Sequence, residues 1–302
     1  FSNPVQGSTF VKHVFQGKWQ RYQYDILKKS LENDEAILIA DFGKNRTIKN
    51  QDATKAEYFT AKQITVHPVV CYSKSCNIET LTIRDSAIFM SNDLKHDHFM
   101  VMKCIDDAID ALKAKKPNLK RFYIYSDGCS SQYKGRKTMN QLSKIRNTSI
   151  IWNFYGSEHG KGEADGEVGC LNRALDNAAL SRKFVFTDAQ DTCEWAQENL
   201  EFDEPGSKRR FIYVPEVSRD NSDVYPLKGI RAYHQIANTQ EVGTLRVQRL
   251  SCFCKICRRN GHTTPECVNS DFVTASTLVK MTSKNDNKAR FLLFLIKFIF
   301  QL

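Results

Sequence analysis

The pattern of apolar and polar positions changes near residue 35. Residues 1–31 hold Trp19, Tyr24 and Leu27 among many basic and polar side chains, and predict a helix that leads into the core. The continuous apolar run 36–40 is typical of a strand covered on both faces, and it ends at Asp41. Two more strands are predicted at residues 63–72 and 81–90. Pro68 lies inside the first of these and requires a bulge or a strand end there, because proline cannot donate a ladder hydrogen bond.

The following segments alternate between helix and strand. Apolar residues recur at helical spacing over residues 97–113, and the dipeptide before Pro117 ends that helix. A strand is predicted at 121–126, a helix at about 133–144 capped by Ser130 or Ser131, a strand at 149–155, and a last helix through Leu171 and Leu175. Three strands, helix, strand, helix, strand, helix is the order of an α/β, ribonuclease H-like mixed five-stranded sheet flanked by helices.

The remaining pattern is weaker and suggests a division of the chain. We expect a helix near 187–200 and a strand at 211–214. The expected units are an N-terminal helical segment (1–33), the ribonuclease H-like domain (34–182), a helical and loop extension (183–250), a zinc-knuckle-like cluster (251–270) and a tail (271–302). The apolar run 290–302 is too short to span a bilayer as a helix, since about 20 residues are needed. A buried helix, a membrane-surface contact and a translated non-coding extension remain open, and the last is favoured.

Composition narrows the setting. The net charge of +10 favours polyanionic partners such as DNA, and no membrane partner is expected. Ten cysteines in a chain of 302 residues, most of them outside any cluster, indicate a reducing compartment, so a nuclear or intracellular location is expected. The chain begins at Phe1 rather than Met, which suggests a fragment.

Two aspartates stand where predicted strands end. Asp41 follows the first strand and Asp127 the fourth, and these strands are neighbours in the predicted sheet, so both carboxylates should share one edge. The first turn of the last helix offers Glu163, Asp165 and Glu167 as a third acid, and spacing alone does not choose among them. Carboxylates suit Mg²⁺ or Mn²⁺ in a two-metal site for phosphoryl transfer. Each aspartate taken alone is more often a loop or capping residue.

Several blocks together resemble uncharacterised transposon-derived proteins with a DDE-type, ribonuclease H-like transposase or integrase domain. The blocks begin at Asp41 (DFGKN), Val66 (VHPVV), Asp93 (DLKHD), Ser126 (SDGCSSQYK), Trp152 (WNF) and His159 (HGKGEADG). The resemblance implies Asp41, Asp127 and Asp165 as catalytic metal ligands, although Ala164 replaces the usual cysteine before Asp165. It implies metal-dependent DNA strand cleavage or transfer, often by a homo-oligomer. A catalytically silent, domesticated DNA-binding or interaction protein is the alternative, and a ribonuclease acting on RNA–DNA hybrids is a third.

Basic residues near the acids are candidates for contacts with nucleic acid. Four of them could bind phosphates: Lys134, Arg136, Lys137 and Lys161. The N-terminus of the helix after Ser131 could bind another phosphate through free N–H groups. A solvated basic face is equally expected for each lysine taken singly.

A cysteine cluster follows near the C-terminus. Cys254, Cys257, His262 and Cys267 have the spacing of a zinc knuckle, a module that binds single-stranded nucleic acid, and Cys252 is a spare ligand. The competing set is Cys252, Cys254, Cys257 and Cys267 with His262 incidental, and the family resemblance favours it. Either set predicts a structural Zn²⁺.

Overall fold

The central strand β1 (Glu35–Ala40) is buried along its whole length. The computed structural model describes residues 9–48, 61–78, 80–156, 162–182, 184–219 and 227–281. Within β1, Ala36 and Leu38 pack in one core, whereas Ile37 and Ile39 pack in another on the opposite face. The apolar run of the sequence therefore does form a strand that is covered on both faces.

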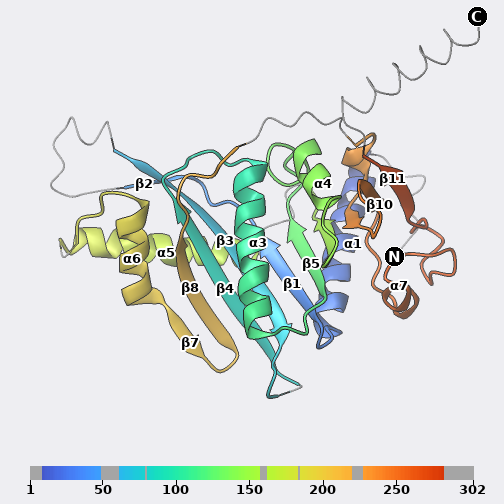
Figure 1. Cartoon of the computed structure of the whole chain (residues 1–302), viewed down its shortest axis with the longest axis horizontal. Coiled ribbons are helices and arrows are strands. Elements are labelled where there is room, and N and C mark those ends of the chain that lie inside the picture. Colours follow the sequence, from blue (N-terminus) through green and yellow to red (C-terminus); the bar gives the residue numbers. More distant parts are fainter. Residues whose placement is uncertain are drawn as a thin grey trace, which may run out of the picture.

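The other four predicted strands surround β1 (Figure 1). β3 (Gln63–Lys74) pairs antiparallel with β1, and β4 (Thr82–Ser91) pairs antiparallel with β3. On the other side β5 (Arg121–Ser126) pairs parallel with β1, and β6 (Ser149–Phe154) pairs parallel with β5. The order β4-β3-β1-β5-β6 makes a mixed sheet, and it confirms that the first and fourth predicted strands are neighbours.

The prediction of five strands was wrong, because the described sheet has 11. Beyond β6 lie β9 (Gln235–Asn238), β10 (Thr244–Gln248) and β11 (Thr277–Lys280). Beyond β4 lie β8 (Ser207–Tyr213) and β7 (Phe202–Glu204), and β2 (Arg46–Thr47) pairs with β3. Residues 183–250, predicted as an extension, thus supply strands to both ends of one sheet.

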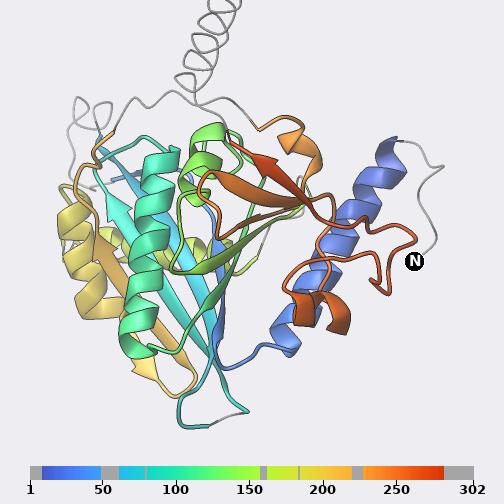
Figure 2. The ribbon, with the colours of Figure 1, turned by 45° about the vertical axis from the view of Figure 1, so that its right-hand side comes forward.

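Helices cover both faces of this sheet (Figures 1 and 2). α3 (His98–Lys115) and α4 (Arg136–Leu142) pack on the face of Ala36 and Leu38. α1 (Thr9–Lys29), α5 (Glu163–Leu180) and α6 (Ala189–Leu200) pack on the other face. Two short elements follow, η2 (Ile230–Ala232) and α7 (Lys255–Asn260). None of the helices among the described residues is long and apolar enough to cross a membrane, and residues 290–302 lie outside the described part of the chain.

Pro68 neither ends nor bulges its strand, contrary to the prediction. Its carbonyl accepts a hydrogen bond from the Asp41 N–H at 3.4 Å, so its backbone polar atoms face the side of β1. β1 ends at Ala40, just before this position. In an antiparallel ladder a residue directs its N–H and C=O to the same neighbour, so the β3–β4 pairing loses no donor to the proline.

The helix predicted to start near Tyr133 begins later. Residues 129–134 form a turn in which the Cys129 carbonyl accepts N–H bonds from Gln132, Tyr133 and Lys134. α4 starts at Arg136 with Gly135 as its N-cap and without a side-chain cap. A Cβ atom at Gly135 would lie 2.5 Å from the Ser130 carbonyl oxygen, so the turn can close only on glycine. The predicted serine cap was therefore wrong, and the helix start at which a phosphate site was predicted lies at Arg136.

Candidate functional site

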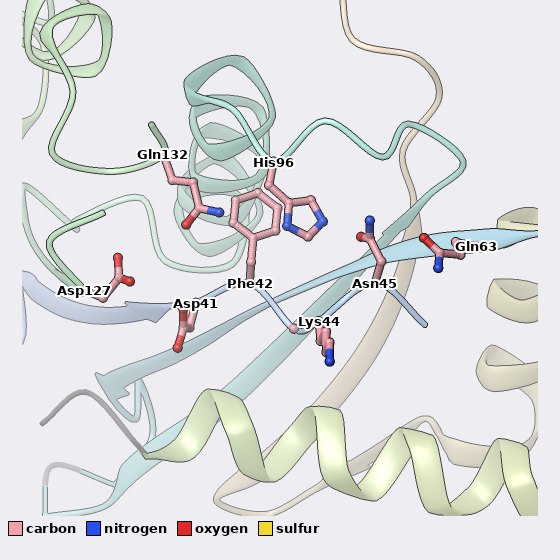
Figure 3. Close-up of a pocket in the computed structure, with 9 residues that line it drawn as sticks. Asp41, Phe42, Lys44, Asn45, Gln63, His96, Asp127 and Gln132 are labelled. Carbon is pink, nitrogen blue, oxygen red and sulfur yellow. The ribbon is translucent and has the colours of Figure 1, made fainter. Parts of the chain in front are cut away.

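Asp41 and Asp127 lie level with each other at one edge of the sheet. The parallel register of β1 and β5 pairs Ile39 with Tyr125, and each aspartate is the second residue after its member of that pair. Figure 3 shows Asp41 pointing toward the start of α5 and Asp127 on the side of Asp41 that is farther from this helix. They line an open pocket of about 510 Å³. The strand ends thus bring together the two acids that the sequence singled out.

Asp165, the candidate third acid in the first turn of α5, does not line this pocket, but it lies close enough to Asp41 for its charge to act on that carboxyl. Its Oδ2 accepts the Gly162 N–H at 3.3 Å, which fixes the carboxylate at the helix N-terminus. Burial has the largest effect on the pKa of Asp41, and the negative charges of Asp127 and Asp165 add to it. Together they raise this pKa to about 7. Burial also raises the pKa of Asp127, although the hydrogen bond that this carboxylate accepts from the Cys129 N–H acts to lower it. Among the described residues, no lysine or arginine forms an ion pair with any of the three.

The other two acids of this turn have structural partners. Glu163 accepts hydrogen bonds from the Tyr24 hydroxyl at 2.8 Å and from Lys28 at 3.3 Å. Burial opposes its ionisation, but a backbone bond and these contacts outweigh burial and lower the pKa of Glu163. Glu167 is buried and accepts bonds from Arg84, Ser86 and Arg209. Neither carboxylate contributes to the raised pKa of Asp41.

We expect Asp41→Asn to stabilise the metal-free protein at alkaline pH. A carboxyl whose pKa is raised by folding contributes stability below its unfolded value, near 4, and that stability is lost as the pH rises through about 7. The variant lacks this loss, so its free energy of unfolding should exceed that of the wild type by about 1 kcal/mol or more at pH 8. Urea unfolding with a chelator at pH 5 and pH 8 measures the difference. An equal gain at both values would contradict the assignment of this pKa.

Aromatic side chains form a wall on one side of this open pocket, beside the acids. Phe42 stacks on His96, with ring centroids 4.3 Å apart and an interplanar angle of 7° (Figure 3). It also packs edge-on against His67, whose Nε2 lies 2.9 Å from the Tyr133 hydroxyl. Burial lowers the pKa of His67 to about 3, so this histidine is neutral. Sequence reasoning missed this wall, although both histidines lie in blocks that carry the family resemblance.

The block DLKHD is explained by Arg219. The Arg219 guanidinium donates to Asp93 and to Asp97, each at 2.6 Å. Asp97 also caps α3 by accepting the N–H groups of Phe99 and Met100. These contacts hold the segment that carries His96, whose Nε2 lies 3.1 Å from the Thr65 hydroxyl. Both aspartates of this block therefore have a positioning role.

The predicted basic contacts separate into three groups. Lys134 is buried: its Nζ donates to the Arg231 carbonyl at 3.2 Å, and burial lowers its pKa to about 8, so its position gives no support to the predicted phosphate contact. Arg136 is exposed, and Lys137 is partly exposed with its Nζ 5.3 Å from the centre of the Phe99 ring. Lys161 lies outside the described residues. Lys44, which the sequence did not single out, is exposed and lines the pocket.

Four cysteines form a compact cluster. The Sγ atoms of Cys252, Cys254, Cys257 and Cys267 all lie within 4.8 Å of one another. Tetrahedral Zn²⁺ with Zn–S bonds of about 2.3 Å requires S···S separations of about 3.8 Å, so the four thiols could hold a metal ion such as zinc. In the described part of the chain no other set of three or more His, Cys, Asp or Glu ligand atoms is so close, the three aspartates included.

His262 is not a member of this cluster. Its Nδ1 lies 2.9 Å from the Asn260 carbonyl, and Cys252 takes the fourth place in the set. Of the two ligand sets left open by the sequence, the arrangement matches the four-cysteine set. Hydrogen bonds, of which the one with the Cys252 thiol has the largest effect, hold the pKa of the Cys257 thiol below its ordinary value. A low thiol pKa favours the thiolate form that binds metals.

The cluster is fastened to the rest of the molecule through α1 and β1. α1 lies along the cysteine-bearing segment (Figure 2). Trp19 donates from Nε1 to the Ser251 carbonyl at 2.8 Å, and its ring packs with Cys252 and Cys257. Arg258 of α7 donates to the fully buried Glu35 at 2.6 Å. Arg258 thus neutralises a carboxylate at the start of β1, a role that the zinc-knuckle interpretation did not foresee.

Comparison with known proteins gives one family. A search of curated proteins finds no match. The model of a domain of unknown function, DUF8701, matches residues 20–251. The matched range includes the three aspartates and both histidines described above, and it ends just before the four cysteines of the cluster. The chain therefore belongs to the DUF8701 family.

Proposed function

We propose that this chain is a DDE-type, metal-dependent phosphoryl transferase that cleaves or joins DNA strands. The strand order β4-β3-β1-β5-β6, with β3 antiparallel and β5 and β6 parallel to β1, is that of a ribonuclease H-like core. Helices on both faces agree with that fold. Function is argued from the site rather than from the fold, because one fold serves many activities.

The observation that carries the proposal is the meeting of three acids at one sheet edge without a counter-ion. Asp41 and Asp127 are level in register, and Asp165 is close enough to contribute to the raised pKa of Asp41. Asp41 and Asp127 are half-buried and Asp165 is exposed, and with no ion-paired lysine or arginine among the described residues the three carboxylates make a site of negative charge. Oxygen donors of this kind suit Mg²⁺ or Mn²⁺.

Their spacing is compatible with a pair of ions rather than one. The three acids are not all within 4.8 Å of one another. Two ions about 4 Å apart, each with bonds of about 2.1 Å, allow oxygens on opposite sides to be about 8 Å apart. A two-metal site therefore does not require all of its carboxylate oxygens to lie within 4.8 Å of one another.

The residues of the site have separate tasks. When bound, the ions would activate the attacking oxygen and stabilise the leaving one. Asp127 is oriented by the Cys129 N–H at 3.0 Å, and Asp165 by the Gly162 N–H. Lys44 at the rim of the pocket supplies a cation for a DNA phosphate. Catalysis would then be positional and electrostatic.

Manganese binding tests which acid is the third ligand. Asp165→Asn should weaken Mn²⁺ binding by about tenfold or more, because it removes an anionic ligand. Glu163→Gln is the matched control, since Glu163 is held by Tyr24 and Lys28, and it should bind Mn²⁺ as the wild type does. Calorimetric titration of the zinc-loaded protein measures both. A larger loss of Mn²⁺ binding in Glu163→Gln than in Asp165→Asn would identify Glu163 as the third ligand and contradict the assignment of Asp165.

The four cysteines complete the proposal as a structural zinc site. All of their thiols are used by one tetrahedral ion, which leaves no open position for a substrate. Their place between α1 and the start of β1 supports a role in holding the fold. Single-stranded nucleic-acid binding by a free knuckle has less support, because Arg258 is turned into the molecule.

The alternative is a catalytically silent scaffold that binds DNA. It is favoured by one observation, the absence from the described residues of a tight carboxylate cluster of the kind that the cysteines form. This alternative predicts salt-sensitive DNA binding without metal-dependent turnover. An assay of DNA cleavage with and without Mg²⁺ or Mn²⁺ separates the two.

A further inference from the structure

A second pocket lies at the other end of the sheet, away from the three acids. It has a volume of about 330 Å³ and is bordered by the start of β6, the β9–β10 turn and the C-terminal end of α7. Its lining consists of glycine and polar residues, and none of them is Asp or Glu. A pocket of this composition excludes both apolar ligands and cations as its preferred occupants.

Arg246 on β10 lines this pocket with a half-buried guanidinium. Its Nη1 has a hydroxyl partner, Ser276 Oγ, at 3.4 Å, and no carboxylate pairs with it in the part of the chain that the structure describes. Burial lowers the pKa of Arg246. Burying a guanidinium without an anion is costly, so the position is suited to an anion from outside the chain.

A second guanidinium adds to the positive charge. Arg146 donates to the carbonyls of Thr239, Ile145 and Ser143, at 2.8 to 2.9 Å. These acceptors are neutral, so they leave the charge of Arg146 uncompensated beside Thr239, which lines the pocket. The field in the pocket is therefore positive from two directions.

His262 faces the same pocket because of the turn that ends α7. Gly261 closes the helix with a φ of 69°, a conformation that favours glycine, and the next residue borders the pocket. A carbonyl can only accept, so His262 Nδ1 donates to the Asn260 carbonyl. Nε2 is left for a ligand, and it donates to a phosphate oxygen when the ring carries both protons. Ser149 and Gln240 offer a hydroxyl and an amide from two further elements, and neither side chain has a hydrogen bond to a described residue.

We propose that this pocket binds a phosphate group. Arg246, His262, Ser149 and Gln240 approach it from four separate elements, which suits the several oxygens of a tetrahedral phosphate better than the two oxygens of a carboxylate. The phosphate comes either from a free phosphate-bearing small molecule or from a polynucleotide backbone. The site is distinct from the three acids, and it assigns a function to the histidine that the sequence placed in the zinc set.

Titration of the zinc-loaded full chain with inorganic phosphate tests the site. At constant ionic strength, phosphate should bind more tightly than acetate, and Arg246→Gln and His262→Gln should each weaken phosphate binding by about tenfold. Arg249→Gln removes the same charge from an exposed position outside the pocket and should leave binding unchanged. Equal binding of acetate, or equal weakening in Arg249→Gln, would overturn the proposal.

Two further readouts make the assignment specific. The absorption spectrum of the Co²⁺-substituted protein should be the same in His262→Gln as in the wild type, and an altered spectrum would make His262 a metal ligand and refute the pocket. Competition with a single-stranded oligonucleotide then identifies the source of the phosphate. If the oligonucleotide displaces phosphate, and this displacement is lost in Arg246→Gln, the natural ligand is a polynucleotide. If phosphate stays bound, the natural ligand is a small molecule.

Discussion

Asp127→Asn is expected to lower metal-dependent DNA cleavage by about a thousandfold or more. The substitution removes one of three negative charges from the site and replaces an anionic ligand by a neutral amide. Metal ions in such sites supply several kcal/mol of transition-state stabilisation, and about 4 kcal/mol corresponds to a thousandfold in rate. The initial rate of strand cleavage in Mg²⁺ or Mn²⁺ measures the loss.

The variant should fail in chemistry while it keeps the fold. The amide that replaces the Asp127 carboxylate would retain an Oδ1 atom to accept the Cys129 N–H, the one hydrogen bond that the structure gives to this side chain. Its free energy of unfolding without metal should equal or exceed that of the wild type, because burial disfavours the charged form of Asp127. DNA binding at low salt should be retained. A parallel loss of stability and cleavage would point to a structural role instead.

Removal of zinc is expected to lower the free energy of unfolding by about 3 to 5 kcal/mol. Without an ion, Cys257 of α7 is no longer linked to the other three thiols. Because Arg258 directly follows Cys257, we expect it to be displaced with this cysteine. Displacing Arg258 leaves Glu35 buried with one arginine fewer, and breaking a buried ion pair costs about 3 to 5 kcal/mol. Denaturant unfolding of the wild type with and without a strong chelator measures the change.

Matched cysteine variants separate this effect from thiol chemistry in general. Cys257→Ser should be as unstable as the chelated wild type and should not respond to the chelator. Cys170→Ser alters an exposed cysteine outside the cluster and should behave as the untreated wild type does. If the chelator leaves wild-type unfolding unchanged, the four thiols hold no ion that matters for stability.

The part of the fold that the sequence predicted is the part with continuous apolar runs. β1 and β5 are predicted with their ends because both are buried along their lengths and stop at an aspartate. This is also why Asp41 and Asp127 were identified without a structure. Asp165 was favoured over Glu163 only by the family resemblance, since spacing alone could not choose between them; their partners differ, but only the structure reveals this.

The missed strands depend on contacts that one sequence does not reveal. β8 overlaps the predicted strand at 211–214 but begins earlier, with Lys208, Arg209 and Arg210. Glu167 and Asp85 from distant segments accept bonds from Arg209 and Arg210. β9 to β11 are short, and β9 joins them to the edge of β6, which lies about 80 residues earlier in the chain. Sequence periodicity cannot detect such long-range pairs.

The same limit applies to single side chains. Lys134 was predicted to contact a phosphate because it lies near the acids in the sequence, but its Nζ lies 4.9 Å from the centre of the Phe154 ring and donates to a distant carbonyl. His262 has the spacing of a zinc ligand, but a nearby carbonyl binds its ring. In both cases distant residues or the local turn decided the outcome, and spacing could not.

Cleavage of end-labelled DNA by the zinc-loaded wild type, with Asp127→Asn beside it, tests the central claim most directly. Duplex DNA, single-stranded DNA and an RNA–DNA hybrid are incubated with Mg²⁺, Mn²⁺ or EDTA, and the products are separated by length. The three-acid site predicts cleavage of DNA that requires Mg²⁺ or Mn²⁺ and is lost in Asp127→Asn. No metal-dependent cleavage by the folded wild type, or undiminished cleavage by the variant, would contradict it.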